Sequence, residues 1–170
     1  MKKPWIFGEI YFLVVFNLFA AELKEKSFPS QLLEIDGEVI QLERLVKEKT
    51  VVVVTLKAVW CAVCQEQLER IKERLKEFSD CNITFLVLAP GPKKGLKQIK
   101  ERTGFPFPFV ADEKLTISEK LSLKLNENEM IPGFLVLGRG LGIHWQQLGR
   151  SPQYFREKEL LKFLKCSEWI

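Results

Sequence analysis

Hydrophobic residues along this chain follow two patterns that alternate from Thr50 onward. The segment TVVVVTLKA, residues 50–58, is a continuous run rich in β-branched residues, and ITFLVLA, residues 83–89, is a second run. Apolar runs without polar alternation are typical of strands that are covered on both faces. Between them, residues 64–78 place Leu68, Ile71, Leu75 and Phe78 at helical spacing. These patterns predict a strand, an amphipathic helix and a second strand, with the first strand at the centre of the sheet.

The flanking segments extend this prediction to an α/β domain. Asp36-Gly37 separates two short stretches of apolar-polar alternation, which predicts an N-terminal β-hairpin closed by a tight turn. Glycines divide Phe134–Leu148 into two short strands, which predicts an antiparallel hairpin at the edge of the sheet. The remaining predictions are, in chain order, a helix over Gly95–Arg102, a proline-rich loop over 104–115, a short helix over Lys114–Leu125 and a closing helix over Tyr154–Lys165.

The first residues have the layout of a targeting segment. Lys2 and Lys3 precede an apolar run from Ile10 to Ala21, and the sequence becomes charged at Glu22. A basic start followed by a short apolar run is typical of a secretory signal peptide. We therefore expect residues 1–21 to be a signal peptide or an N-terminal membrane anchor, residues 22–27 a linker and residues 28–170 the domain. The expected location is extracytoplasmic or the secretory pathway; the alternative is an N-terminal extension on a cytoplasmic protein.

Composition narrows the range of functions. Hydrophobic residues make up 46% of the 170-residue chain, which is enough to form a core without metal or disulfide staples. The chain carries 26 basic and 22 acidic residues, and the net charge of +4 is not concentrated as a nucleic-acid binder would require. We therefore expect no nucleic-acid partner, and the cysteines have to be explained by something other than the needs of folding.

Two of the four cysteines, Cys61 and Cys64, stand three residues apart behind Trp60, where the predicted strand meets the predicted helix. The N-terminus of a helix stabilises a thiolate and lowers the pKa of a thiol below about 8.5, so Cys61 is the candidate nucleophile. Residues at i and i+3 of a helix lie about 5–6 Å apart, so Cys64 can close a disulfide with Cys61. Thiol–disulfide exchange by such a pair needs no cofactor.

The other cysteines leave a metal site as an alternative. A structural zinc ion takes about four ligands, so Cys81, Cys166 and His144 would have to converge on the Cys61–Cys64 pair from separate elements. None of these three residues has the spacing of a second ligand pair. We therefore expect no metal site and interpret Cys81 and Cys166 as inert thiols.

With these elements in place, the sequence resembles the thioredoxin-like superfamily, and within it the AhpC/TSA and redoxin group, which includes TlpA-like thiol-disulfide oxidoreductases. The resemblance is carried by EIDGEVIQLERLVKEKTVVVVTLKAVWCAVC, FPFPFVADEKLTISEKLSL and MIPGFLVLGRGLGIHW. It implies a thioredoxin-like fold with a central mixed sheet flanked by helices. It further implies that Cys61 is the nucleophile, that Cys64 resolves the mixed disulfide, and that Trp60 and a cis-proline loop at Ile131-Pro132 contact the substrate. The implied partners are thiol or disulfide-containing proteins and an unidentified redox partner.

Departures from the family pattern keep other functions open. Thioredoxins have a buried acid six residues before the nucleophile, where this chain has Thr55, and many relatives have threonine where this chain has Gly133. The alternative enzyme is a peroxiredoxin-like thiol peroxidase, whose Pro-x-x-x-Thr-x-x-Cys site would require proline and threonine at Val54 and Ala58. Peroxiredoxins also have an arginine where this chain has Pro132. A non-enzymatic metal-binding or adaptor domain is the remaining alternative.

Overall fold

A five-stranded mixed sheet with the strand order β5-β4-β3-β8-β9 organises the computed structural model, which describes residues 27–79, 81–149 and 157–164. β3 (Thr50–Thr55) lies in the middle, parallel to β4 (Ile83–Ala89), and β4 is parallel to β5 (Phe109–Ala111). β8 (Gly133–Leu137) pairs with β3 in the antiparallel sense, and β9 (Ile143–Leu148) forms the other edge. The prediction of a central first strand and of an edge hairpin is confirmed.

The uninterrupted apolar run of β3 follows from burial on both faces. Val52 and Val54 belong to one hydrophobic core, whereas Val51 and Val53 belong to a second core on the opposite face. Successive side chains of a strand point to opposite faces, so a strand between two cores needs apolar residues at every position.

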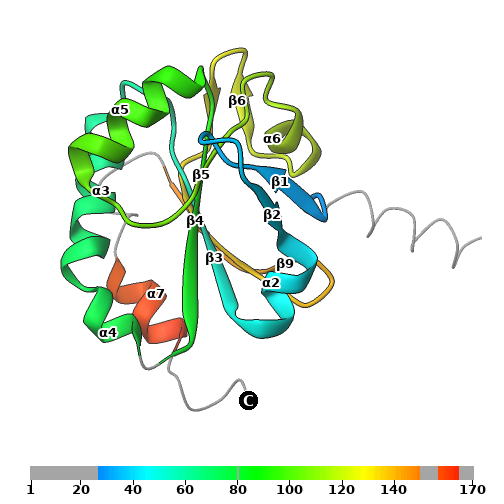
Figure 1. Ribbon diagram of the computed structural model, residues 1–170, viewed down its shortest axis with the longest axis vertical. Helices are drawn as coiled ribbons and strands as arrows, with labels where there is room; N and C mark the ends of the chain where they lie inside the picture. Colours follow the sequence, from blue (N-terminus) through cyan, green and yellow to red (C-terminus); the bar gives the residue numbers. More distant parts are fainter. Residues whose placement is uncertain (1–26, 80, 150–156, 165–170) are drawn as a thin grey trace, which may run out of the picture.

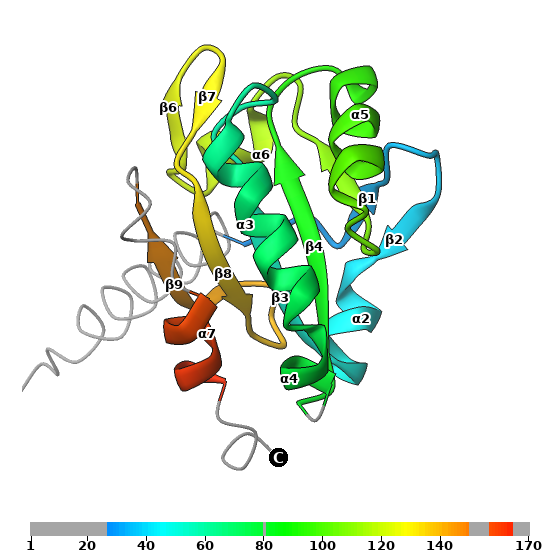
Figure 2. The ribbon, with the colours of Figure 1, turned by 90° about the vertical axis from the view of Figure 1, so that its left-hand side faces the viewer.

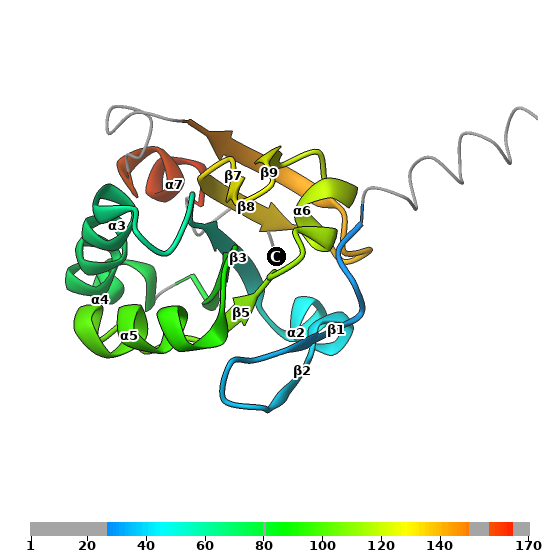
Figure 3. The ribbon, with the colours of Figure 1, turned by 90° about the horizontal axis from the view of Figure 1, so that it is seen from above.

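Helices cover both faces of the sheet (Figures 1 and 3). One face carries α3 (Ala62–Glu73), α4 (Leu75–Ser79), α5 (Lys93–Thr103) and α7 (Glu157–Phe163). Figure 2 shows α3, α5 and α7 in front of the strands. The other face carries α2 (Leu42–Glu48), α6 (Thr116–Lys120) and the predicted N-terminal hairpin of β1 (Gln31–Leu33) and β2 (Val39–Gln41). This arrangement confirms the α/β fold with a central mixed sheet, flanking helices and an N-terminal hairpin.

Several elements differ from the prediction. The expected helix over Lys114–Leu125 is the shorter α6, followed by an antiparallel hairpin of β6 (Lys124–Asn126) and β7 (Glu129–Met130). The helix begins where the buried Asp112 carboxylate accepts hydrogen bonds from two backbone amides, and it ends before Ser122, whose φ is 60°. β5 lies within the expected loop, and α2 was not predicted. The helix expected over residues 64–78 divides into α3 and α4 at Arg74, whose amide donates to Ile71.

The ends of the chain lie mostly outside the described residues. This applies to the expected signal peptide or anchor at 1–21, to most of the linker, and to Cys166. Within the described part, no helix is long and apolar enough to cross a membrane. Cys81 was expected to be a thiol but is disulfide-bonded. Its Sγ lies 3.5 Å from the carbonyl oxygen of Leu164, so the start of β4 is close to the end of the C-terminal helix.

Candidate active site

The cysteine pair lies at the junction of β3 and α3. Cys61 is the N-cap residue of α3, and its Sγ accepts a hydrogen bond from the Cys64 amide at 3.3 Å. A disulfide joins Cys61 and Cys64, whose Cα atoms are 5.3 Å apart. An N-cap side chain points at amides that have no partner within the helix, so the first cysteine lies where a thiolate is stabilised. The predicted placement of the pair at the start of the helix is therefore what the fold produces.

The two sulfurs have different surroundings. Cys64 is buried, with 1% of its surface exposed, whereas Cys61 is half-buried and is followed by the exposed Ala62. The Lys57 amide donates to Cys64 Sγ at 3.3 Å, so the inner sulfur also has a backbone donor. Cys61 is therefore the more accessible residue of the pair.

Contacts from α3 and α5 hold the loop before the cysteines. The Gln65 side chain donates to the Val59 carbonyl oxygen at 3.1 Å, and the Arg102 guanidinium donates to the Gln65 side chain. The Val59 side chain packs so closely on Gly91 that a Cβ there would lie 3.0 Å from Val59 Cγ1. Gly91 also has a φ of +100°, which other residues rarely adopt. The turn at Gly91 thus supports the strand-to-helix loop.

Trp60 is the most exposed large hydrophobic residue near the disulfide. Its exposed fraction is 63%, and the Lys57 ammonium lies 4.8 Å from the ring centroid. A cation over an indole at this distance is a favourable contact that orients the ring. The tryptophan next to Cys61 therefore presents an apolar surface to solvent.

The segment expected to face the cysteines lies beside the end of β3. Thr55 pairs with Gly133, and the Thr55 hydroxyl donates to the carbonyl oxygens of Ile131 at 2.9 Å and Gly133 at 3.3 Å. The Ile131 amide donates to Leu123 at 2.7 Å, so a substrate backbone could pair with that amide only by displacing this bond. Pro132 is buried, and Ile131 is half-buried.

The Ile131–Pro132 peptide bond is trans, since none of the described peptide bonds is cis. The cis bond implied by the resemblance was therefore a wrong expectation for this chain. The carbonyl of Ile131 is held by the Thr55 hydroxyl, and its amide is held by the turn before β6, so both polar backbone groups of Ile131 have partners inside the domain.

A close approach of two strands explains the glycine after this proline. A Cβ at Gly133 would collide with the carbonyl oxygen of Gln147 and would lie 3.0 Å from Leu148 Cα on β9. Backbone atoms cannot give way as a flexible side chain can, so threonine does not fit here. The departure from the family pattern at this position is thus a consequence of how β8 and β9 pack.

A family model described as the AhpC/TSA family matches residues 21–145. The chain belongs to the AhpC/TSA family. This confirms the resemblance to thioredoxin-fold redox proteins that the motifs around Cys61 and Pro132 indicated. A comparison with curated protein sequences finds no match.

Solved structures share the fold of this AhpC/TSA-family chain. Peroxidoxin BcpB from Mycobacterium tuberculosis has a TM-score of 0.70 and 16% sequence identity, over 82% of this chain and 93% of its own. Peroxiredoxin Q from Xanthomonas campestris has a TM-score of 0.69 and 14% identity, over 81% and 90%. A secreted M. tuberculosis disulfide oxidoreductase homologous to E. coli DsbE has a TM-score of 0.61 and 13% identity, over 84% and 97%. At such identities the likeness establishes the fold alone.

Among AhpC/TSA proteins, peroxiredoxins and disulfide oxidoreductases are distinguished by the residues around the nucleophile. The positions where a peroxiredoxin has proline and threonine are Val54 and Ala58, which are buried and apolar. The hydroxyl of Thr55, the residue after Val54, donates to the carbonyl oxygens of Ile131 and Gly133. In the described part of the chain, no three histidine, cysteine, aspartate or glutamate residues converge as metal ligands.

Sequence reasoning missed one charged residue at the site. Glu129 on β7 lies 3.3 Å from the Lys57 ammonium, although the two residues are far apart in the sequence. No motif or periodicity marks Glu129, because β7 has only two residues and lies beyond the helix expected over Lys114–Leu125.

Proposed function

We propose that this AhpC/TSA-family chain is a thiol-disulfide oxidoreductase that exchanges disulfides with protein thiols through Cys61 and Cys64. The observation that carries the proposal is the disulfide at the start of α3, with Cys61 half-buried and Cys64 fully buried. A redox pair needs one sulfur that a partner can reach and a second that meets only the first. The unequal burial of the two cysteines provides this arrangement.

The exchange proceeds in two substitutions at sulfur. In the reduced protein, the Cys61 thiolate attacks a substrate disulfide, a Cys61–substrate bond forms, and the second substrate sulfur leaves and takes a proton. The Cys64 thiolate then attacks the Cys61 sulfur, releases the first substrate thiol and restores the Cys61–Cys64 disulfide. Two electrons pass to the substrate, and the reverse sequence oxidises a substrate dithiol. The Lys57 amide, 3.3 Å from Cys64 Sγ, stabilises negative charge on the resolving sulfur.

The exposed indole of Trp60 supports an extended polypeptide as the substrate. Trp60 is 63% exposed and directly precedes Cys61 in the chain, so an apolar side chain near a substrate cysteine can pack on the indole. In this proposal the half-buried Ile131 meets the substrate through its side chain as the opposite wall of the contact, and the buried Pro132 shapes that wall without meeting the substrate. The electron donor or acceptor that restores the starting state is a second thiol protein.

A redox titration with glutathione tests the proposal. We expect the purified chain to form a Cys61–Cys64 disulfide reversibly, detected by alkylation and mass mapping. The variant Cys64→Ser should trap a mixed disulfide at Cys61, and Cys61→Ser should trap none, because Cys64 is buried. If the Cys61–Cys64 disulfide does not form and break reversibly, the oxidoreductase proposal fails.

A thiol peroxidase is the second candidate, supported by the structural likeness to peroxiredoxin Q and peroxidoxin BcpB. Val54 and Ala58 argue against it, because neither side chain carries the hydroxyl with which a peroxiredoxin threonine polarises the peroxide. Mixing the reduced chain with peroxide separates the two functions. A rate no greater than that of a simple thiol eliminates the peroxidase, and a strongly accelerated rate favours it over disulfide exchange.

A non-enzymatic metal-binding or adaptor role requires a different measurement. Metal analysis of protein purified without chelators would detect stoichiometric copper or zinc that is lost in Cys64→Ser. Such a result would replace disulfide exchange by metal binding as the function of the pair.

We further propose that the chain is exported or membrane-anchored through residues 1–21. The disulfide-bonded state of Cys81, in addition to the Cys61–Cys64 pair, supports an oxidising compartment, since cytosolic proteins seldom keep disulfides. N-terminal sequencing of the protein from its native host tests this. If the signal peptide is cleaved, we expect the mature protein to begin near residue 22. If the segment is an anchor, we expect the protein in the membrane fraction. An intact Met1 in a soluble cytosolic fraction contradicts both.

A further inference from the structure

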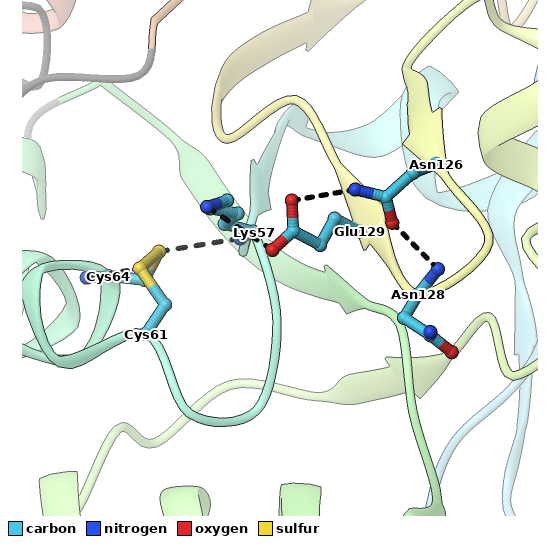
Figure 4. A network of polar contacts seen from close by, with 6 residues as sticks. All are labelled: Lys57, Cys61, Cys64, Asn126, Asn128 and Glu129. Atoms are coloured by element: carbon cyan, nitrogen blue, oxygen red, sulfur yellow. Dashed lines mark hydrogen bonds and ion pairs between the residues drawn. A yellow bond between two sulfur atoms is a disulfide. The ribbon is translucent and has the colours of Figure 1, made fainter.

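Lys57 connects the disulfide to a carboxylate from a distant part of the chain (Figure 4). Its backbone amide lies 3.3 Å from Cys64 Sγ, and its ammonium lies 3.3 Å from Glu129 Oε1. The side chains are 31% exposed for Lys57 and 20% exposed for Glu129. Figure 4 shows Lys57 between the sulfurs and Glu129. The Lys57–Glu129 ion pair is therefore partly shielded from solvent. Charges in such a partly buried position interact more strongly than charges at the surface.

The carboxylate is held from its other side as well. The Asn126 side chain donates to Glu129 Oε2 at 2.9 Å, and the Asn128 amide donates to Asn126 Oδ1 at 2.9 Å (Figure 4). The Met130 amide donates to the Lys57 carbonyl oxygen at 3.1 Å, which attaches β7 to the end of β3. These bonds place both Glu129 and Lys57 without help from a substrate.

The ammonium also reaches the nucleophile's neighbour. It lies 4.8 Å from the ring centroid of Trp60, the residue before Cys61. The charged residues Glu66 and Arg70 on α3 pair with each other at 3.9 Å. Lys57 thus lies between the cysteine pair and Glu129 (Figure 4), with its backbone amide bonded to Cys64 Sγ and its ammonium paired with the carboxylate.

We propose that Lys57 and Glu129 set the reduction potential of the Cys61–Cys64 pair. This inference rests on the function proposed above. Reduction by an external dithiol brings two electrons and breaks the S–S bond, and a positive charge beside the sulfurs favours the thiolate that results. Lys57 therefore raises the reduction potential by stabilising the reduced form. Glu129 limits this effect by neutralising Lys57, so the two residues oppose each other.

Charge-removing variants of the full chain test the proposal in a glutathione titration. We expect Glu129→Gln to shift the exchange equilibrium toward the reduced form by about threefold to tenfold, since one tenfold step corresponds to about 30 mV. Lys57→Met should shift it toward the oxidised form by a similar factor. Lys57→Arg keeps the charge and should stay near the wild-type value, which separates the charge from the packing of the side chain.

The pH dependence of Cys61 alkylation by iodoacetamide supplies a readout that a purely structural role would not move. We expect Glu129→Gln to lower the pKa of the Cys61 thiol and Lys57→Met to raise it. Lys124→Met is the matched control, because Lys124 on neighbouring β6 also pairs with carboxylates, Glu119 at 3.9 Å and Glu127 at 3.5 Å. It should change neither the equilibrium nor the alkylation profile.

The outcomes separate this inference from the proposed function. If the wild-type chain titrates reversibly but Glu129→Gln and Lys57→Met match it, the inference is overturned and the oxidoreductase stands. Shifts of the same sign in both variants would also overturn it. If the wild-type disulfide cannot be reduced and reformed, the proposed function itself fails.

Discussion

Thr55 shows how one side chain positions the segment that leads into β8. Its hydroxyl is buried and donates to the carbonyl oxygens of Ile131 and Gly133, which lie 76 and 78 residues further along the chain. A chain that follows the thioredoxin pattern would have an acid at this position. Here the position connects β3 to the start of β8, and the charged groups near the sulfurs come from Lys57 and Glu129.

Replacing this hydroxyl should destabilise the domain. We expect Thr55→Val to lower the free energy of unfolding by about 1–3 kcal/mol, because the part-buried Ile131 carbonyl and the buried Gly133 carbonyl lose this donor. Thr55→Ser keeps the hydroxyl and should retain that hydrogen bond. Urea unfolding of both variants measures the difference, and equal stability of the valine and serine variants would show that the hydroxyl contributes nothing.

Gly133 is constrained by the backbone of β9. We expect Gly133→Ala to lower the free energy of unfolding by about 1–3 kcal/mol or more, because the added Cβ collides with the Gln147 carbonyl. Gly140→Ala is the matched control, since nothing lies within 4 Å of a Cβ there. Thermal unfolding of the two variants compares the sites. A Gly133→Ala protein as stable as Gly140→Ala would mean that β8 and β9 can move apart at no cost.

At the scale of elements, the end of α7 lies beside the start of β4, where Cys81 is disulfide-bonded. We predict that Cys81 pairs with Cys166, the one remaining cysteine, because Cys61 and Cys64 are joined to each other. Cys81→Ser should then lower the free energy of unfolding by about 2–4 kcal/mol under non-reducing conditions. Mass mapping identifies the partner directly, and an intermolecular Cys81 bond would contradict the prediction.

The N-terminal hairpin is attached to α5 by ion pairs. Lys100 lies 2.7 Å from Glu34 and 2.9 Å from Asp36, and Lys97 lies 3.2 Å from Asp36. Hydrogen bonds from Lys100 and then Lys97 hold the pKa of Asp36 below its ordinary value of 3.8. A carboxyl group whose pKa is lowered on folding stabilises the folded protein above its ordinary pKa, and loses this effect as the pH falls through the lowered value.

The lowered pKa of Asp36 predicts how the stability that it contributes to the hairpin changes with pH. We expect Asp36→Asn to be less stable than the wild type at pH 7, and the difference to shrink as the pH falls below the ordinary pKa of 3.8. Urea unfolding across this range measures it. Glu38→Gln is the matched control for the loss of one negative charge, because it changes a carboxylate on the same hairpin for which the described residues show no ion pair.

At the scale of the whole molecule, the redox state of the pair and the stability of the fold are two parts of one thermodynamic cycle. Any group that stabilises the reduced pair only in the folded protein must also stabilise the reduced protein against unfolding. We therefore expect Lys57→Met to lower the free energy of unfolding of the reduced protein more than that of the oxidised protein. Urea unfolding of both redox forms, in a Cys81→Ser background that removes the other disulfide, provides the measurement.

A variant that cannot form the disulfide is the control for this measurement. Cys64→Ser cannot form the disulfide, so its stability should not depend on added reductant in that background. An equal effect of Lys57→Met on both redox forms of the chain would show that Lys57 contributes packing alone, independently of the charge on the sulfurs.

The sequence by itself determined the elements whose signals are local. The β-branched runs of β3 and β4, the apolar spacing of α3 and the position of Cys61 at the start of that helix are each contained in about a dozen neighbouring residues. Family motifs added the expectation that the Ile131-Pro132 segment faces the pair. The fold class and the candidate redox pair therefore needed no knowledge of which distant segments touch.

Only the tertiary structure decided which residues surround the sulfurs. β5 and the β6–β7 hairpin are too short for a periodic signal, and their backbone pairs form because neighbouring segments are already in place. The features around the sulfurs depend on residues far apart in sequence. They are the burial of Cys64, the hydrogen bond from Thr55 to Ile131 and the ion pair of Glu129 with Lys57. Contacts of this kind depend on which distant segments lie next to the end of β3, and the local pattern of residues does not specify those neighbours.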